Sequence, residues 1–346
     1  WQCIRAFLPT QHLLTYLAAI LRVYNLEGRR DNLYKARIKI LVNALGIDAF
    51  REKVEQQWAR SKDSDDTFSA EYLAALQAQF PAAPLLGKLQ TTLELDNGSH
   101  EAPDQAFSNP LFNQWYQANT RPHRDSGRRI VYLSLKAPGT PAGDITADQM
   151  DTVAELAERF SESEIRSTHE QNLVLAHVPV NELFALWTEL KDAGLATPNL
   201  GKLTDMIVCP GLDYCSLANA GTLDIHDQIY QRFDDLDYLH ELGDISIKIS
   251  GCMNACGHHH IGDIGILGVD KGGVEWYQLT IGGHAGNKAA LGQRLGKAIA
   301  KSDLADAISG LLEAYVAVRE PEESFHDAVT RLGTAPFKEK VYATAA

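Results

Sequence analysis

The sequence predicts a mixed α/β protein of the α+β class, and three patterns carry that prediction. Between 128 and 194 the expected order is strand, helix, strand, strand, helix, which is the order of a ferredoxin-like split βαβ unit. Ile245, Ile247 and Ile249 alternate with polar residues and predict a strand that ends beside a cysteine. Apolar residues at helical spacing from 304 to 319 predict a long helix. A chain of 346 residues exceeds one average domain and can bury a large core.

The first 125 residues are expected to be mostly helical. Residues 10–25 predict an amphipathic helix with Thr10 as a possible N-cap and an apolar stripe of Leu13, Leu17, Ile20, Leu21 and Tyr24. The basic run from 29 to 39 is interpreted as a solvated face, with an anion contact as the sharper alternative. A second amphipathic run passes through Phe50 and Val54. From 61 to 125, short helical pieces (69–80 and 112–116) alternate with Pro, Asn and Gly, which indicates a connecting region.

The split βαβ unit has one expected element after another. A strand at 129–135 is followed by a helix at 146–160, with Met150, Val153, Leu156 and Ala157 on one side. Two strands, 164–168 and 172–178, flank a tight turn. A helix at 181–192 then carries Leu183, Leu186, Trp187 and Leu190 on its apolar side.

The remaining elements predict a second α/β region. A short strand at 203–208 leads into a cysteine loop, and a helix follows at 225–239. Strands are expected at 245–251, 261–269 and 276–281, and helices at 288–299 and 304–319. Functional residues on loops at strand ends are the usual arrangement in such folds.

Four of the five cysteines occur in two short clips. Cys209 and Cys215 form a C-x5-C pair, and Cys252 and Cys256 form a C-x3-C pair, whereas Cys3 lies apart. A cubane iron–sulfur cluster needs four thiolates that converge on a small volume, and two loops brought together by the fold can supply them. Glycine and alanine beside the cysteines allow backbone N–H groups to approach the sulfurs.

Three other interpretations compete with a cluster. Buried thiols that only pack in a core do not usually occur as two closely spaced pairs. A chain that can bury a large core does not need disulfides for stability. Structural zinc sites favour C-x2-C or C-x4-C knuckles, a spacing that neither clip has. The spacing favours the cluster, and a non-catalytic four-cysteine zinc module stays as the alternative of another class. His258, His259 and His260 invite a metal interpretation, but three adjacent histidines cannot all face one ion, so packing is preferred.

The cysteine segments and two others together resemble a known family. The segments "CPGLDYCSLANA", "ISGCMNACGHHHIGDIGILGV", "HEQNLVLAHV" and "ILRVYNLEGRRDNLYKARIKIL" are similar to those of the sirohaem- and [4Fe–4S]-containing sulfite and nitrite reductases. The chain resembles in particular the C-terminal part of the assimilatory sulfite reductase haemoprotein (beta) subunit. One departure is Gly221, where relatives lead us to expect a basic residue.

The resemblance implies cofactors, a reaction and partners. It implies a [4Fe–4S] cluster held by Cys209, Cys215, Cys252 and Cys256, with Cys256 also bridging to the sirohaem iron as its axial ligand. The implied reaction is the six-electron reduction of sulfite to sulfide, with nitrite reduction to ammonia as the alternative. The implied electron donor is a flavoprotein or a ferredoxin. Glu170, Gln171 and Asn172 either face the cofactor or simply form a polar turn.

The resemblance also implies a division of the chain. Residues 1–60 would be the tail of a first α/β domain, 61–125 a connecting region, and 126–195 the second copy of a ferredoxin-like half-domain. Residues 200–335 would form the [4Fe–4S] and sirohaem α/β domain, and 336–346 a C-terminal tail. The chain has no initiator Met, so we expect a fragment of a protein with a pseudo-two-fold repeat. The substrate-binding Arg and Lys residues are expected in the missing N-terminal half, and the sequence itself assigns no catalytic residue.

Composition limits the possible partners. A net charge of −13 argues against nucleic-acid binding, which needs a basic face. No apolar run is long enough for a membrane span, and few cysteines grouped for metal are typical of a reducing cytoplasm. The sequence contains no nucleophile-elbow, HExxH or Walker motif.

Overall fold

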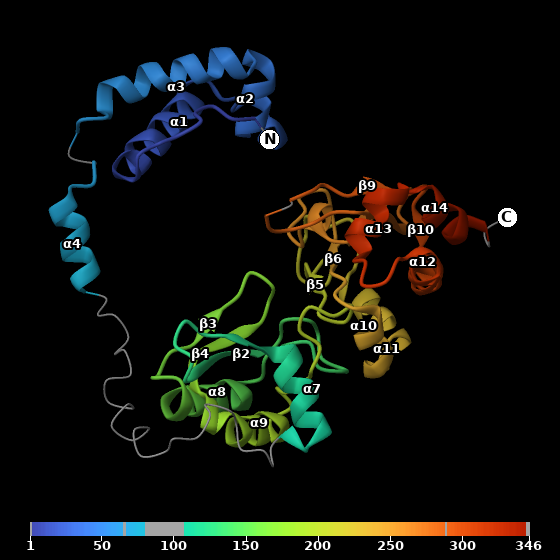
Figure 1. The fold of residues 1–346 in the computed structure, drawn as a ribbon. Helices are drawn as coiled ribbons and strands as arrows, with labels where there is room; N and C mark the ends of the chain where they lie inside the picture. The colour runs from blue at the N-terminus through green and yellow to red at the C-terminus, as the bar shows by residue number, and fades with distance from the viewer. Residues whose placement is uncertain (1, 65–66, 80–106, 288, 344–346) are drawn as a thin grey trace. The chain divides into compact units, whose positions relative to one another are not determined.

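Residues 2–64, 67–79, 107–287 and 289–343 are described by the computed structural model (Figure 1). The chain divides into two units, Trp1–Asn97 and Gly98–Ala346, and each is considered by itself. No helix among these residues has both the length and the apolar character needed to cross a bilayer.

The described part of the first unit is helical. Its elements are η1 (Thr10–His12), α1 (Leu13–Glu27), η2 (Leu33–Lys35), α2 (Ile38–Leu45), α3 (Ile47–Ser61) and α4 (Ala70–Ala78). α1 packs against α3 around a small core that includes Tyr16, Val23, Phe50, Val54 and Trp58. The expected helices at 10–25, around Phe50 and at 69–80 are therefore present, although residue 80 lies outside the described residues.

The buried face of α1 differs from the one that the leucines predicted. Leu13, Leu17 and Leu21 are exposed, Leu21 at 61%. The core face is instead built from Tyr16, Ala19 and Val23, about a third of a turn away at 100° per residue, and Ile20 and Tyr24 contact its edge. Thr10 begins the 3-10 turn and does not cap α1, whose N-cap position is His12.

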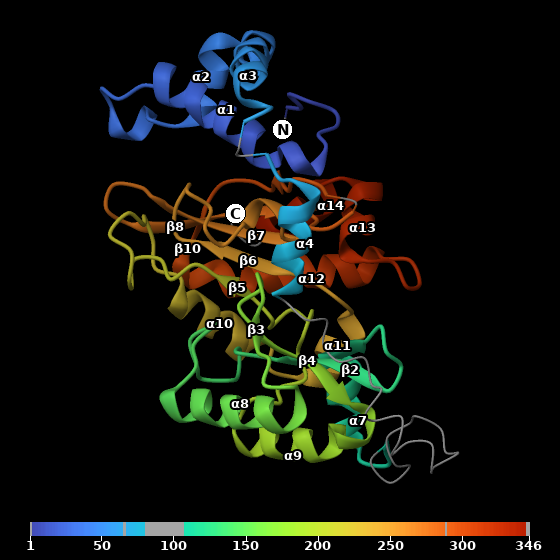
Figure 2. The ribbon, with the colours of Figure 1, turned by 90° about the vertical axis from the view of Figure 1, so that its left-hand side faces the viewer.

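The second unit begins with a four-stranded antiparallel sheet of order β1-β2-β4-β3. Its strands are β1 (Thr120–Pro122), β2 (Arg128–Leu133), β3 (Arg166–Ser167) and β4 (Leu173–Pro179). Its helices are α7 (Pro110–Asn119), α8 (Ala147–Phe160) and α9 (Leu183–Asp192), with η3 (Val180–Glu182) before α9. α8 and α9 lie side by side on one face of this sheet (Figures 1 and 2). The predicted order of strand, helix, strand, strand, helix is confirmed.

The packing of this sheet follows the sequence pattern at nearly every position. Thr146 and Gln149 form a capping box that starts α8 where the sequence predicted it. Leu183, Leu186, Trp187 and Leu190 are all buried in one core cluster. Met150, which was expected on the apolar side of α8, is instead 52% exposed because it lies in the first turn, before the helix reaches the core.

The rest of the second unit is a six-stranded mixed sheet. The strands are β5 (Ile207–Val208), β6 (Ile247–Ser250), β7 (Ile264–Asp270), β8 (Glu275–Ile281), β9 (Gln293–Arg294) and β10 (Ile299–Ala300). Their order is β10-β8-β7-β6-β5, with β9 paired to β8. β5, β6 and β7 run parallel, and β8 is antiparallel to β7.

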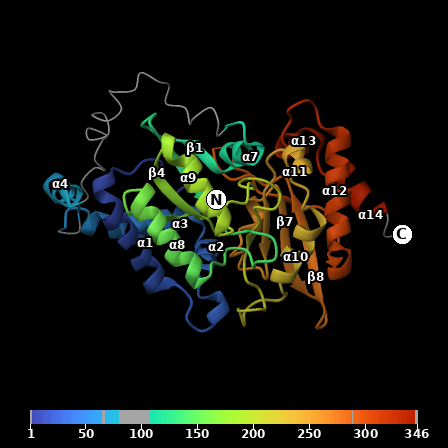
Figure 3. The same ribbon diagram turned by 90° about the horizontal axis from the view of Figure 1, so that it is seen from below.

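Helices cover this second sheet. They are α10 (Leu223–Arg232), α11 (Leu236–Leu242), η4 (His259–Ile261), η5 (Lys301–Asp303), α12 (Leu304–Val318), α13 (Phe325–Leu332) and α14 (Ala335–Tyr342). α12 runs alongside the sheet (Figure 3). Ile247 and Ile249 are fully buried, and so are the other two residues of β6, so this strand is covered on both faces.

Two expectations for this region are wrong. Residues 289–300 form no helix but carry β9 and β10, since Gly292 and Gly296 disfavour a helix and Ile299 pairs with Tyr277 of β8. The helix expected at 225–239 is broken into α10 and α11, and the Asp235 side chain caps the second. Farther along the chain, Phe337 and Val341 of α14 are buried in the core.

Candidate metal centre

The two cysteine clips leave neighbouring parallel strands at the same edge of the sheet. Cys209 directly follows β5, and Cys252 lies two residues beyond the end of β6. Val208 pairs with Ile249 in the parallel ladder between these strands. Because the carboxyl ends of parallel strands meet at one edge, the pairing brings both loops to the same place.

Backbone hydrogen bonds hold the two loops together. The Cys209 N–H donates to the Ile249 carbonyl at 3.0 Å. The N–H groups of Asn219 and Ala220 both donate to the Gly251 carbonyl, at 2.8 and 3.1 Å. A Cβ added to Gly251 would lie 2.7 Å from the Cα of Gly211, so the loops touch where neither has a side chain.

Tight turns shape each loop. The Cys215 N–H donates to the Gly211 carbonyl at 2.9 Å, and the Ala255 N–H donates to the Cys252 carbonyl at 3.1 Å. Ala255 has a φ of 58°, a left-handed conformation that is uncommon for a residue with a side chain. Such backbone strain is often found at functional sites.

The four thiols of the clips come together. Cys209 and Cys252 are buried, Cys215 is partly buried and Cys256 is exposed. The Cys256 side chain lies close to that of Cys209. Partial desolvation raises the pKa of the Cys256 thiol, and the nearby thiols of Cys209, Cys252 and Cys215 raise it further. Cys3 is exposed and lies in the first unit.

The donor set of this site suits an iron–sulfur cluster. Four thiols that converge from two loops are the ligands that a cubane cluster requires.

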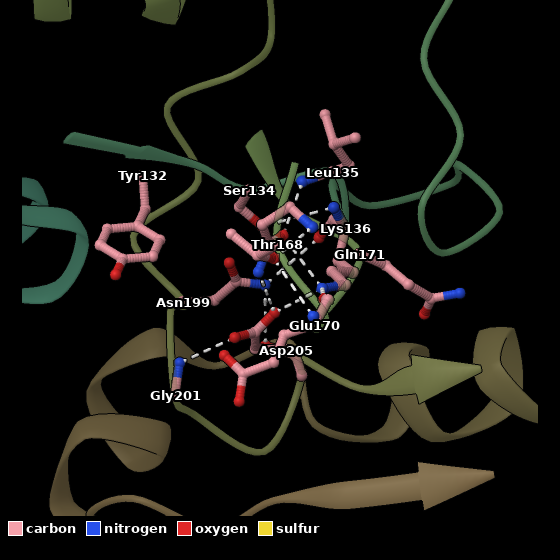
Figure 4. Close-up of polar contacts among 12 residues, drawn as sticks. Tyr132, Ser134, Leu135, Lys136, Thr168, Glu170, Gln171, Asn199, Gly201 and Asp205 are labelled. Carbon is pink, nitrogen blue, oxygen red and sulfur yellow. Dashed lines mark hydrogen bonds and ion pairs between the residues drawn. The ribbon is translucent and has the colours of Figure 1, made fainter. Parts of the chain in front are cut away.

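A buried ion pair supports the loop that leads to Cys209. The Lys136 side chain is fully buried and donates to Asp205 at 2.8 Å and to the Asn172 side chain at 2.9 Å, and also to the Glu170 carbonyl (Figure 4). Burial lowers the pKa of Lys136, and the Asp205 carboxylate partly offsets this effect. This network joins the four-stranded sheet to the segment before β5.

Gln171 links the same turn directly to the cysteine strand. Its amide donates to the Val208 carbonyl at 2.9 Å and accepts from the Val208 N–H at 2.9 Å. Val208 immediately precedes Cys209, so the Gln171 side chain acts as a substitute strand partner at this point. The turn at 170–172 therefore has a structural function, in addition to the two roles considered from sequence.

The three adjacent histidines face different surroundings. His259 is buried, whereas His258 and His260 are exposed. Burial, with a smaller contribution from His260, lowers the pKa of His259 to about 4. Its ring stacks on that of His260 at a centroid distance of 4.0 Å.

Sequence reasoning missed Lys136, Asp205 and the pairing of Gln171 with Val208. A lysine that ends an apolar strand, at "YLSLKA", is the one local signal for a buried cation. Its partner Asp205 is 69 residues away, and no local pattern connects the two.

Comparison with known families agrees with this geometry. The family described as "Nitrite and sulphite reductase 4Fe-4S domain" matches residues 2–62 and 201–345. The family described as "Nitrite/Sulfite reductase ferredoxin-like half domain" matches residues 128–193. The chain therefore belongs to the sirohaem- and [4Fe–4S]-containing nitrite and sulfite reductase family, which is a family of oxidoreductases. This membership implies a [4Fe–4S] cluster and a sirohaem as cofactors.

The similar proteins include both nitrite reductases and sulfite reductases. A ferredoxin–nitrite reductase of Synechococcus elongatus is 26% identical over 89% of this chain and 52% of its own length. A sulfite reductase [ferredoxin] of Mycobacterium tuberculosis is 27% identical over 95% of this chain and 53% of its own. The structure of the M. tuberculosis NirA protein has a TM-score of 0.64 and 25% identity, and the match covers 97% of this chain and 55% of that one. The chain spans about half the length of these relatives.

Proposed function

We propose that this chain is the cluster-bearing half of a sirohaem-dependent reductase of a small oxyanion. In this proposal Cys209, Cys215, Cys252 and Cys256 hold the [4Fe–4S] cluster, and Cys256 is also the axial ligand of the sirohaem iron. The observation that carries it is the convergence of four thiols from two loops that the fold joins backbone to backbone.

The exposure of the thiols supports the proposal that all four bind the cluster and that Cys256 alone also binds the sirohaem iron. Cys209 and Cys252 are buried, so their sulfurs can hold iron away from water. Cys256 is the exposed member of the set, so its sulfur can reach an iron that lies outside the loops. The cluster, when bound, supplies single electrons to the sirohaem iron, at which the oxyanion is reduced.

We propose sulfite as the substrate, reduced to sulfide with six electrons. Relatives named as sulfite reductases support this choice, and those named as ferredoxin–nitrite reductases support nitrite as the second candidate at nearly the same identity. Turnover of the full-length protein with each anion decides between them. A strong preference for nitrite in kcat/KM would overturn the sulfite assignment.

A ferredoxin is the proposed electron donor, since the similar reductases are named for it, and a flavoprotein is the alternative. The proposed domains are 1–60, 61–125, 126–195, 200–335 and 336–346, and the last of these includes part of α14. Arg and Lys residues that bind the anion are proposed to lie outside this chain.

Grouped free thiols support a reducing compartment, and we propose the cytoplasm.

Replacing Cys256 tests the ligand assignment. Cys256→Ser removes one cluster thiolate and the proposed haem bridge, so we expect a loss of roughly one iron or more per chain and altered sirohaem absorption bands. Cys3→Ser, which alters an exposed thiol in the other unit, is the matched control and should leave both unchanged. Unchanged iron content in Cys256→Ser contradicts the assignment.

The absorption spectrum of the purified protein excludes the two other classes. A protein that holds zinc in the four thiols absorbs no visible light, because zinc has a filled d shell. A plain electron-transfer protein with the cluster alone lacks the intense macrocycle bands. Either result would remove the sirohaem reductase from consideration.

A further inference from the structure

We propose that Asp263, His284 and His326 form a second metal site, for one divalent transition-metal ion such as Zn²⁺ or Fe²⁺. These residues come from three separate places: the position before β7, the third position after β8, and the second residue of α13. One ligand atom of each lies within 4.8 Å of the other two. Two imidazoles and one carboxylate are a ligand set that zinc and non-haem iron both use.

The site lies at the opposite edge of the sheet from the cysteines. Cys252 follows the carboxyl end of β6, whereas Asp263 precedes the first residue of β7, which runs parallel to β6. Ile281 at the end of β8 pairs with Ile264 at the start of β7, so His284 lies at the same edge as Asp263. Four residues of extended strand separate the two edges by about 13 Å.

Hydrogen bonds from Ser246 orient the Asp263 carboxylate through one of its two oxygens. Ser246 donates to Asp263 Oδ2 from its N–H at 2.8 Å and from its hydroxyl at 2.7 Å, and its hydroxyl accepts from the Asp263 N–H at 3.0 Å. Both hydrogen bonds to the carboxylate go to Oδ2, so Oδ1 is available as a ligand atom. Partners that orient a ligand in this way are typical of metal sites.

The approach of β8 to the loop before β7 brings His284 toward Asp263. A Cβ on Gly283 would lie 2.5 Å from the Gly262 carbonyl and 2.8 Å from that of His260, so only glycine permits this contact. The preceding Gly282 has a φ of 77°. Two glycines before His284 thus allow the chain to turn against the backbone next to Asp263.

His326 supplies an independent observation. The centroids of the His284 and His326 rings are 4.7 Å apart. The His326 Nδ1 atom is buried and has no hydrogen-bond partner among the described residues. A metal ion would give this buried atom a partner, and native proteins satisfy nearly all such atoms. A metal ion bound by both rings and by Asp263 would also tie α13 to the sheet edge.

Zinc binding by the cofactor-loaded protein tests the proposal. Iron then occupies the cysteines, so thiolates do not compete for the added Zn²⁺. After chelator treatment that leaves the iron content unchanged, we expect one Zn²⁺ per chain by equilibrium dialysis and an increase in Tm. His326→Ala and His284→Ala should each weaken Zn²⁺ binding at least tenfold and abolish the increase in Tm. His169→Ala, which alters a side chain 85% exposed in the same unit, should leave both unchanged.

This experiment tests the second metal site independently of the proposed reductase function. Equal Zn²⁺ affinity in the parent, His326→Ala and His284→Ala, or no saturable binding in the parent, overturns the second site. Asp263→Asn adds a third arm; if it fails to fold because Ser246 loses its partner, the two histidine variants still decide. Iron content and the visible spectrum report on the cysteine centre separately, so loss of one site does not obscure the other.

Discussion

The Gln171 side chain forms the two backbone hydrogen bonds with Val208 that a neighbouring strand would otherwise form. We expect Gln171→Ala to lose both hydrogen bonds to Val208 and to lower the free energy of unfolding of the second unit by about 2 kcal/mol, at about 1 kcal/mol for each bond. The loosened backbone before Cys209 should also lower the iron content of the purified protein. Denaturant unfolding and iron analysis measure the two effects.

The neighbouring His169 provides the control for Gln171. Its side chain is exposed, so His169→Ala should match the parent in both measurements. If Gln171→Ala also unfolds at the same denaturant concentration and keeps its iron, the amide has no positioning role.

His259 should make the protein sensitive to mild acid. Its pKa is about 4 in the folded chain, below the ordinary value of 6.5, so below pH 6.5 the unfolded chain binds a proton that the folded chain does not. The stabilising contribution is complete above pH 6.5 and declines toward pH 4. We expect a loss of about 1 kcal/mol between pH 7.5 and pH 5.5.

The variant His259→Gln isolates this contribution, because glutamine does not titrate. The free energy of unfolding of parent and variant is measured across the same pH range, and the parent should fall more steeply by about 1 kcal/mol in total. Parallel curves would show that His259 takes up its proton equally in both states.

Single residues also show where local sequence information ends. The clip residues Cys209, Cys215, Cys252 and Cys256 can be proposed as ligands from sequence because their spacing within each clip is local. The Lys136–Asp205 pair could not, because its partners belong to different segments and meet only after the two sheets pack. Asp263, His284 and His326 meet for the same reason, and no spacing rule joins them.

At the scale of elements, the contact between the two cysteine loops depends on the absence of a side chain at Gly251. In Gly251→Ala the new Cβ would lie 2.7 Å from Gly211 Cα and 2.9 Å from the Ala220 carbonyl, both of which are backbone atoms. The loops must separate, so we expect a loss of roughly 2–4 kcal/mol in stability and little bound cluster. Iron content and thermal unfolding measure the result.

Gly221→Ala is the matched control for this contact. Its added Cβ would meet its nearest neighbour at 3.5 Å, an ordinary van der Waals distance. This variant should keep its iron and unfold within about 0.5 kcal/mol of the parent. Equal iron content in the two variants would mean that the close approach of the loops is not required for the cluster.

Helices whose apolar residues follow one clear helical period could be predicted from sequence. Elements whose buried face or type depends on tertiary packing could not. The capping box at Thr146 and the apolar stripe of α9 determine those helices locally. In α1 two apolar faces compete, and the side chains of α3 decide that Tyr16 and Val23 are buried. Ile299 pairs with Tyr277, so tertiary pairing outweighs the helical spacing that the segment shows.

At the scale of the whole molecule, the two units should respond differently to loss of the cluster. All four thiols belong to the unit Gly98–Ala346, and the small core around Trp58 belongs to the other. In the proposed arrangement the cluster would cross-link loops on either side of α10 and α11, so we expect its free energy of binding to stabilise the second unit alone. Removing it by oxidation and chelation should lower the Tm of that unit by about 5–10 °C.

Hydrogen exchange followed by peptide resolves where the change occurs. Amides of β5, β6 and the loops around Cys209 and Cys252 should exchange faster in the apoprotein, because the backbone bonds to Ile249 and Gly251 lose the cross-link that holds the loops together. Amides of α1 and α3 should keep their protection, since their hydrogen bonds and core lie within their own unit. Equal loss of protection in both units would show that they unfold as one cooperative body and that the cluster stabilises the entire chain.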